Sequence, residues 1–231
     1  MKVLVIPDVH LKPQMFRQAA AFMRAGKAKR AVCLMDIPDD WDREYDIACY
    51  EETYDEAIRF AVEFPDTAWC YGNHDLSYFW HCPESGYSSV ASETVQRKLL
   101  ELRRKVPEDN PICYVQKIDH VLFSHGGVLN YFVEEYVPKS KYHDVDAVVK
   151  EINKLGRTEM WNDMSPIWLR PQHSGMRLYK PRKILQVVGH TPMDEITREK
   201  NLISTDVFST YRDGRASGTQ EFLLLDPETW E

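Results

Sequence analysis

Five short polar motifs stand just past apolar runs, and their residue types are those that bind divalent cations and transfer protons. The first is DVH, which places Asp8 and His10 two residues apart after the apolar stretch 3–6. The other four are MDIPDD with Asp36, Asp39 and Asp40, YGNHD with Asn73, His74 and Asp75, SHGG with His125, and GHTP with His190. Carboxylates, imidazoles and one amide oxygen suit ions such as Mn²⁺, Fe²⁺ or Zn²⁺. The motifs contain no thiolate, which disfavours a structural zinc site.

Each motif taken alone has a simpler explanation. An Asp or Asn after a strand is often a turn former or a helix N-cap, and a single His is more often hydrogen-bonded than a ligand. Glycines beside them can serve the turns alone. Five such motifs in the same position relative to apolar runs are harder to explain in this way. In open α/β sheets the carboxyl ends of the strands are where ligands bind.

The elements that would carry these motifs alternate along the first half of the chain. Apolar runs at 2–6, 31–35 and 67–71 predict strands, and helical spacing at 16–24 and 50–64 predicts helices between them. This alternation favours βαβ units and a parallel sheet. Further helices are predicted at 90–106 and 144–155, and short strands at 112–118, 121–124, 184–188, 202–205 and 222–225. Residues 161–183, with three prolines, predict a long structured loop.

Composition limits the classes of protein and partner. The chain has 231 residues, of which 43% are hydrophobic and 12% aromatic, so we expect a single folded domain over residues 1–231. Its formal charge of −7 argues against long nucleic acids but not against a small phosphorylated substrate or a phosphopeptide. The five scattered cysteines, the lack of a signal-peptide pattern and the lack of a membrane-spanning stretch predict a cytoplasmic protein with no membrane partner.

The order DVH, MDIPD, GNHD, SHGG and GHTP resembles the motif set of the calcineurin-like metallophosphoesterase superfamily. The SHGG and GHTP motifs and the C-terminal segment 202–226 are similar to the branch that contains Ser/Thr protein phosphatases and bacterial diadenosine tetraphosphatases. The resemblance covers the chain from Asp8 to His190 and implies an α/β fold. That fold would be a four-layer α/β/β/α sandwich with mixed sheets.

The same resemblance implies a centre of two divalent metal ions, with Mn²⁺ expected and Fe, Zn or Ni as alternatives. The implied ligands are Asp8 and His10 for the first ion, Asp36 for both ions, and Asn73, His125 and His190 for the second. Two cations about 3.5–4 Å apart would neutralise phosphoryl oxygens and activate a bridging water. His74 would protonate the leaving group, Asp75 would orient its imidazole, and Asp39 would support the site from outside the ligands.

The sequence departs from the superfamily pattern in its second and third motifs. Met35 stands where the second motif normally begins with Gly. The arginines that normally grip phosphate are missing after Asp39 and after the GNHD motif. Arg170 in SPIWLRP is a candidate replacement, since a guanidinium can contact phosphate bidentately, although it can equally cap a loop or pair with an acid. Asn73 is the other substrate-binding candidate.

Three functions from two classes remain open at this stage. The leading hypothesis is a metallophosphatase that hydrolyses phosphate monoesters or nucleotide phosphoanhydrides. The first alternative is a phosphodiesterase acting on small or cyclic nucleotides. The second is a non-catalytic scaffold of the same fold that binds proteins, which is disfavoured because every ligand position and His74 are present. An aromatic cluster at 78–80 could stack on a base or aryl ring, but packing in the core is the favoured interpretation.

Overall fold

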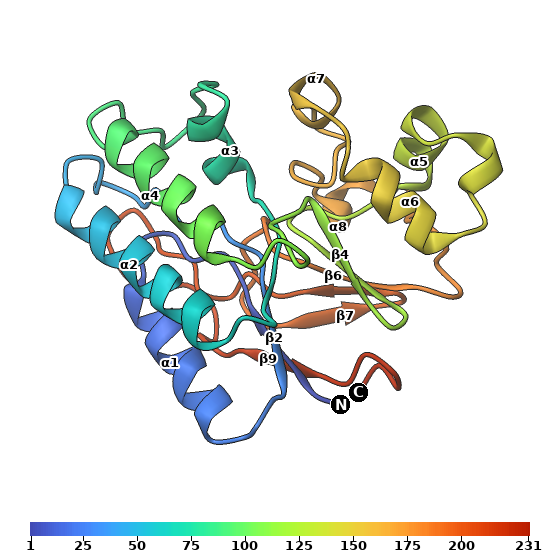
Figure 1. The fold of residues 1–231 in the computed structure, drawn as a ribbon, viewed down its shortest axis with the longest axis horizontal. Helices are drawn as coiled ribbons and strands as arrows, with labels where there is room; N and C mark the ends of the chain where they lie inside the picture. The colour runs from blue at the N-terminus through green and yellow to red at the C-terminus, as the bar shows by residue number, and fades with distance from the viewer.

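Two β-sheets packed face to face form the centre of the molecule, and helices cover both outer faces (Figure 1). The computed structural model describes residues 1–231 with the exception of the Ser174 side chain. The helices α1 to α4 lie on one side of the sheets, and α5 to α8 on the other (Figure 1). This arrangement is the mixed α/β sandwich that the sequence predicted.

The first sheet has the strand order β3-β2-β1-β9. Its strands are β1 (Val3–Ile6), β2 (Arg30–Cys33), β3 (Ala68–Trp69) and β9 (Leu223–Leu225). The first three run parallel, while β9 pairs antiparallel with β1. Parallel strands require crossovers, and α1 (Pro13–Arg24) and α2 (Ile47–Glu63) supply them. The carboxyl ends of β1, β2 and β3 therefore meet at one edge.

The second sheet has the order β4-β5-β6-β8-β7. Its strands are β4 (Val115–Ile118), β5 (Val121–Ser124), β6 (Leu185–Val188), β7 (Thr197–Glu199) and β8 (Leu202–Ser204). The inner strands β5, β6 and β8 are parallel, and β4 and β7 pair antiparallel at the edges. The loops that follow β5 and β6 carry the SHGG and GHTP motifs.

Both faces of the central strands are buried, which explains why the sequence shows unbroken apolar runs rather than alternation. Val3 and Val5 of β1 pack toward the second sheet, in the same cluster as Phe123 and Val187. Leu4 and its alternate neighbours instead pack under the helices. Two layers of apolar contact on every central strand hold the strand ends in fixed positions.

The remaining helices are α3 (Asn73–Phe79), α4 (Ser92–Lys105), α5 (Asn130–Tyr136), α6 (Val145–Ile152), α7 (Arg157–Met160) and α8 (Pro171–Ser174), with a 3₁₀ turn, η1 (Lys139–Lys141). On one face α2 packs between α1 and α4. Sequence periodicity predicted the long helices with small shifts of their ends. It missed α3, α5, α7 and α8, which are too short to show a helical period. None of the described helices is both long and apolar enough to cross a membrane.

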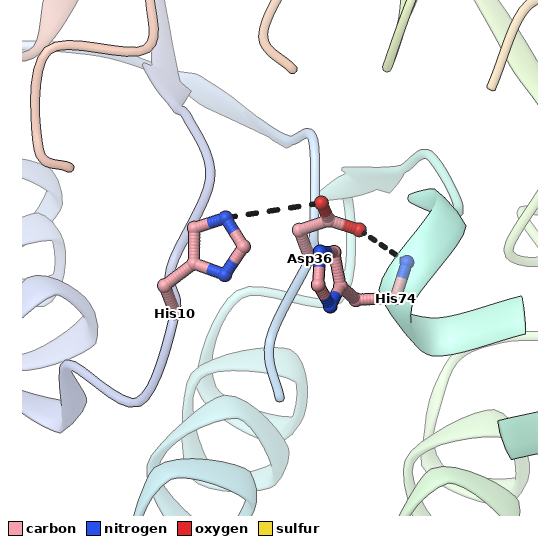
Figure 2. Close-up of side chains that lie close together, drawn as sticks. All are labelled: His10, Asp36 and His74. Carbon is pink, nitrogen blue, oxygen red and sulfur yellow. Dashed lines mark hydrogen bonds and ion pairs between the residues drawn. The ribbon is translucent and has the colours of Figure 1, made fainter. Parts of the chain in front are cut away.

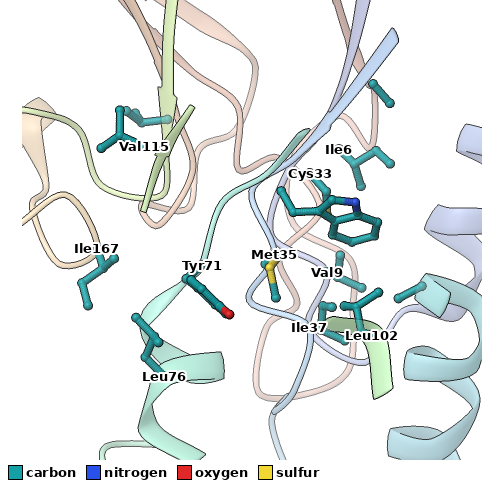
Figure 3. Close-up of a cluster of buried hydrophobic side chains, with 14 of the residues drawn as sticks. Ile6, Val9, Cys33, Met35, Ile37, Tyr71, Leu76, Leu102, Val115 and Ile167 are labelled. Atoms are coloured by element: carbon teal, nitrogen blue, oxygen red, sulfur yellow. The ribbon is translucent and has the colours of Figure 1, made fainter. Parts of the chain in front are cut away.

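Met35 occupies a position that favours glycine because of its backbone conformation. Its φ of 55° lies in the left-handed region, which costs a non-glycine residue about 1–2 kcal/mol. Its side chain is fully buried in the core, close to Val9, Ile37 and Tyr71 (Figure 3). The thioether therefore fills space beneath the site, and apolar packing offsets the unfavourable backbone.

Candidate active site

The five polar motifs lie together where the two sheets present the carboxyl ends of their central strands. Asp8 and His10 follow β1, and Asp36 follows β2. The YGNHD motif follows β3 and begins α3, so Asn73 and His74 occupy the first turn of that helix. His125 follows β5 and His190 follows β6. The interpretation of strand-end residues as one cluster is thus consistent with the topology.

Asp36 lies between two groups of ligand-type atoms. On one side, His10, Asp36 and His74 each offer an atom within 4.8 Å of the others. The Asp36 carboxylate lies 3.9 Å from His10 Nε2 and accepts a hydrogen bond from the His74 backbone N–H at 2.9 Å (Figure 2). The rings of His10 and His74 are 5.1 Å apart and perpendicular.

On the other side of Asp36, the second group gathers around one imidazole nitrogen. His125 Nε2 lies 3.0 Å from Asp36 Oδ2, 3.0 Å from Asn73 Oδ1 and 3.1 Å from His190 Nδ1. Two oxygens and two ring nitrogens thus converge from three different loops and one helix. These four residues are the ligand set that the family resemblance implies for the second ion, and their binding of a cation stays a prediction.

The backbone fixes which nitrogen of two histidines faces the cluster. His10 Nδ1 lies 2.8 Å from the Asp39 carbonyl oxygen, and His125 Nδ1 lies 3.1 Å from the Leu34 carbonyl oxygen. A carbonyl only accepts, so Nδ1 of each ring carries the proton and donates it there. Nε2 of each ring then faces the Asp36 side and offers its lone pair whenever the ring is neutral, as in metal-binding histidines.

The electrostatics of the cluster are those expected for a cation site. Burial opposes ionisation of Asp36, but His125 and His74 outweigh it and lower its pKa. Burial lowers the pKa of His125, yet Asp36 and Asp8 raise it to about 9. Burial, His125 and Arg170 lower the pKa of His190 to about 2. The proton on His125 balances the negative charge of the carboxylates, as a divalent cation bound there would. The residues present therefore fit such an ion.

Two glycines allow backbone to touch the buried carboxylates. A Cβ at Gly72 would lie 1.9 Å from Asp36 Oδ1, and one at Gly189 would lie 1.9 Å from Asp8 Oδ1.

The chain also places His10, Asp36 and His190 at positive φ, of 41°, 41° and 64°. Left-handed non-glycine residues are strained and concentrate at functional sites. The packing of the strands beneath the loops maintains these conformations.

His74 is held by Asp39, whereas the sequence had led us to expect Asp75 in this position. His74 Nδ1 lies 2.8 Å from Asp39 Oδ2, and the other Asp39 oxygen accepts hydrogen bonds from the hydroxyls of Tyr50 and Tyr78. Burial lowers the pKa of His74, but Asp36, Asp39 and Glu84 outweigh it and raise it to about 10. A protonated imidazole donates from both nitrogens, which suits a proton donor better than a metal ligand.

Asp75 points back toward the backbone of the second motif. Its carboxylate accepts hydrogen bonds from the N–H groups of Asp36 at 2.9 Å, Gly72 at 3.1 Å and Ile37 at 3.2 Å. The first turn of α3 projects residues 74 and 75 in different directions, so neighbours in sequence do not share a partner. Asp75 thus fixes the loop that carries Asp36 and does not orient the imidazole of His74.

Asp8 accepts the His190 backbone N–H at 2.9 Å, and its Oδ2 lies 3.9 Å from His125 Nε2. Its assignment to the first ion stays a prediction. Burial, Asp206 and Asp36 raise the pKa of Asp8.

Asp206 was missed by sequence reasoning, although it is buried and follows β8 as the other site residues follow their strands. Because the other polar site residues directly follow strands, the same pattern in the segment 202–206 would have pointed to Asp206.

Arg170 lies beside the last motif. Its Nη1 donates to the His190 carbonyl oxygen and lies 3.4 Å from Thr191 Oγ1. The residue is exposed, so part of its side chain stays accessible to a ligand. The contact with backbone matches the loop-capping alternative, and its role in phosphate binding stays a prediction. In the aromatic cluster, Tyr78 is buried in the core and stacks on Tyr87 with ring centroids 4.3 Å apart, while Phe79 and Trp80 are partly buried against the core.

Glu84 is a second residue that sequence reasoning missed. Its side chain is 11% exposed, and Oε1 lies 2.8 Å from Asn73 Nδ2 and 3.3 Å from His74 Nε2. Burial raises the pKa of Glu84, and His74 opposes that effect. Glu84 lies in the irregular segment after α3 and follows no strand, so no sequence pattern pointed to it.

A mixed α/β sandwich with carboxylates and imidazoles gathered at its strand ends is the arrangement expected of a metal-dependent phosphoesterase. The model of the calcineurin-like phosphoesterase family matches residues 1–215. The chain belongs to that family and is a hydrolase that acts on phosphoric esters. A search of the curated proteins finds no matching relative.

Solved structures of similar fold include cold-active protein tyrosine phosphatases. One, from a psychrophilic Shewanella species, has 17% sequence identity, a TM-score of 0.57, and an alignment covering 98% of this chain and 76% of that one. A point mutant of a cold-active protein tyrosine phosphatase gives a TM-score of 0.59 at 17% identity, with the same coverages. At this level of identity the likeness establishes the fold and leaves the substrate open.

Proposed function

We propose that this chain hydrolyses phosphate monoesters or nucleotide phosphoanhydrides with the help of two divalent cations. The observation that carries the proposal is the position of Asp36. Its carboxylate lies between His10, a proposed ligand of the first ion, and the group of His125 and His190, with His74 beside it as the proposed proton donor. A carboxylate can serve two cations at once, whereas a neutral ligand does so poorly. Asp8 and Asn73 complete the proposed ligand set, and Mn²⁺ is the ion we expect.

The cations supply Lewis acidity, which neutralises phosphoryl charge and makes water a better nucleophile. The protein contributes a proton donor and the means to hold it. His74 carries a proton at Nε2, and Asp39 holds Nδ1 at 2.8 Å so that the ring keeps one orientation. Nε2 can deliver its proton to the departing oxygen, a step that raises the reaction rate about 10²–10⁴-fold in other enzymes.

Arg170 is the proposed contact for the phosphoryl group. It is anchored by the His190 carbonyl oxygen and so lies at the border of the ligand cluster. A guanidinium has five donors, and one anchored N–H leaves others for a phosphate oxygen. The substrate class we favour is a small phosphorylated molecule or a phosphopeptide. The tyrosine phosphatases of similar fold make an aryl phosphate monoester the first substrate to test.

A phosphodiesterase is the second candidate, and Glu84 is the observation that favours it. Its carboxylate lies 3.3 Å from His74 Nε2, where it would repel a phosphoryl group that carries two negative charges. A diester carries only one such charge. The comparison of monoester and diester substrates therefore belongs in the first experiment.

The test measures hydrolysis of an aryl phosphate monoester and an aryl phosphate diester by metal-stripped protein. Mn²⁺, Zn²⁺, Fe²⁺, Ni²⁺ and Mg²⁺ are added back separately. We expect metal-dependent monoester turnover that Asp36→Asn abolishes and His74→Asn lowers by about 10²-fold or more. Asp42→Asn is the matched control, because Asp42 is an exposed carboxylate on the same loop.

The other outcomes separate the alternatives. A preference for the diester would move the assignment to a phosphodiesterase. Binding of two ions without turnover of either substrate would favour the protein-binding scaffold. Turnover that persists after metal removal would overturn the proposal.

A further inference from the structure

The segment 82–88 lies close to His74. Gly86 has a φ of 89°, and a Cβ at this position would lie 3.2 Å from His74 Cε1. The positive φ favours glycine here, and an added Cβ would make a tight contact with the imidazole. This approach brings the neighbouring Glu84 into contact with the first turn of α3.

Contacts with α3 and neighbouring loops fix the segment in place. The Ser88 N–H donates to Tyr78 Oη at 2.7 Å, and Ser88 Oγ donates to the Glu44 carbonyl oxygen at 2.5 Å. The Tyr87 ring stacks on that of Tyr78, and the Tyr87 N–H donates to the Glu84 carbonyl oxygen at 3.1 Å. The same Tyr78 hydroxyl also donates to Asp39. The segment is thus joined to the residues that hold His74.

Glu84 determines which end of the Asn73 amide faces the ligand cluster. An ionised carboxylate only accepts hydrogen bonds, so it must face the amide NH₂ group. Asn73 Nδ2 donates to Glu84 Oε1 at 2.8 Å, and this contact turns Asn73 Oδ1 to within 3.0 Å of His125 Nε2. With the amide reversed, an NH₂ group would face the cation and could not bind it.

We propose that Glu84 is a positioning residue of this site: it fixes the amide of Asn73 with its oxygen toward the second cation and joins that ligand to His74. This inference rests on the proposed function, because it assumes that Asn73 is a ligand. Glu84 Oε1 contacts both partners, so one carboxylate oxygen connects the second ligand group with the proposed proton donor. The role is local to one of the two ions.

The experiment measures binding of Mn²⁺ by equilibrium dialysis, which is independent of turnover. Wild-type protein should bind two ions per chain. Glu84→Ala should weaken one of the two binding steps by about 10–100-fold, the usual effect of removing a group that supports a ligand. Glu84→Gln should weaken the same step less, because its amide oxygen can still accept from Asn73 but no longer dictates the orientation. Glu108→Ala, which removes an exposed carboxylate, is the control.

A second variant tests the geometry without removing the carboxylate. Gly86→Ala strains the backbone at φ 89° and crowds the His74 imidazole, so it should disturb the segment and weaken the same binding step as Glu84→Ala does. The thermal midpoint of each metal-free variant, compared with that of wild type, shows whether folding has suffered. A binding step weakened at an unchanged midpoint supports the inference. Two unaltered binding steps in Glu84→Ala overturn it, whereas failure of wild type to bind two ions overturns the proposed function itself.

Discussion

Among single side chains, His74 is distinguished by the carboxylates that contact it. Asp39 and Glu84 face its two ring nitrogens, and Asp36 lies close by. These negative charges overcome the effect of burial and keep the imidazole protonated well above the pH at which a free histidine loses its proton. A general acid must be protonated when the substrate arrives, and this protonation state suits the proposed role of His74 as the proton donor.

We predict that Asp39→Asn shifts the alkaline limb of the pH–rate profile to lower pH. Asp39 raises the pKa of His74, so removing its charge lowers that pKa and His74 loses its proton earlier as the pH rises. The measurement is kcat for an alkyl phosphate monoester, whose leaving group needs protonation, across pH 6–10. Asp40→Asn serves as the control, since Asp40 pairs with Lys12. An unmoved alkaline limb would contradict the role of Asp39.

We predict that metal affinity rises with pH. The pKa of His125 is about 9 in the metal-free protein, so at neutral pH a proton occupies the nitrogen that a cation needs. Binding must release that proton, and the logarithm of the association constant should rise by about one for each pH unit between 6 and 8. Calorimetric titration of Mn²⁺ in buffers of different ionisation enthalpy counts the protons released. Affinity that does not change with pH would show that His125 is already neutral.

At the level of strands and loops, the site depends on how closely backbone approaches carboxylate. The loop after β6 places Gly189 against Asp8, and the turn before α3 places Gly72 against Asp36. Both contacts join a loop of one motif to the carboxylate of another. The position of each of these two carboxylates is therefore set by two loops rather than by its own loop alone.

Gly189→Ala should abolish tight metal binding. Its Cβ would lie 1.9 Å from Asp8 Oδ1, so either the loop or the carboxylate must move, and overpacking of this kind costs about 1–3 kcal/mol of stability. Equilibrium dialysis with Mn²⁺ and urea unfolding measure the two effects. Gly156→Ala is a fair control, because its nearest contact would be 3.4 Å away. Equal metal affinity in the two variants would show that the loop adapts.

Met35→Gly should destabilise the protein while leaving turnover largely intact. Glycine relieves the left-handed backbone at φ 55°, a gain of about 1–2 kcal/mol. Loss of a buried methionine side chain costs about 2–5 kcal/mol, so the net loss in the free energy of unfolding should centre on about 2 kcal/mol. Urea denaturation of the metal-free protein measures it, with Met35→Leu as the volume-conserving control. A more stable glycine variant would show that backbone strain dominates.

Over the entire molecule, the cluster connects the two sheets. Asp8, Asp36 and Asn73 follow strands of the first sheet, whereas His125 and His190 follow strands of the second. A cation bound by both groups would act as a cross-link between the halves of the sandwich, in addition to the apolar layer between the sheets. Metal binding and folding stability should then be coupled.

Metal removal should therefore lower the thermal midpoint. At a free ion concentration about 100 times the dissociation constant, one bound ion adds about 2.7 kcal/mol. For a chain of this length that corresponds to roughly 5–10 °C. Differential scanning calorimetry with and without Mn²⁺ tests this, and Asp36→Asn should lose most of the shift. A midpoint that does not respond to Mn²⁺ in wild type would contradict ligation from both sheets.

The sequence by itself determined the central strands, the long helices and most of the polar residues of the site. Apolar runs with no alternation marked strands buried on both faces, and the polar residues just past them marked one edge of the sheets. Those signals are local in the chain, so they can be read without the fold. They located Asp8, His10, Asp36, Asn73, His74, His125 and His190.

Only the tertiary structure decided which of these groups touch. Asp39 rather than Asp75 faces His74, because the turn of α3 directs adjacent side chains to different partners. Glu84 reaches the site from an irregular segment, and its contact with Asn73 spans eleven residues of chain. A hydrogen bond is made or lost with a change of a few tenths of an ångström in the donor–acceptor distance, and it depends on the direction of each side chain. These are set by the packing of the whole chain and leave no periodic signal in the sequence.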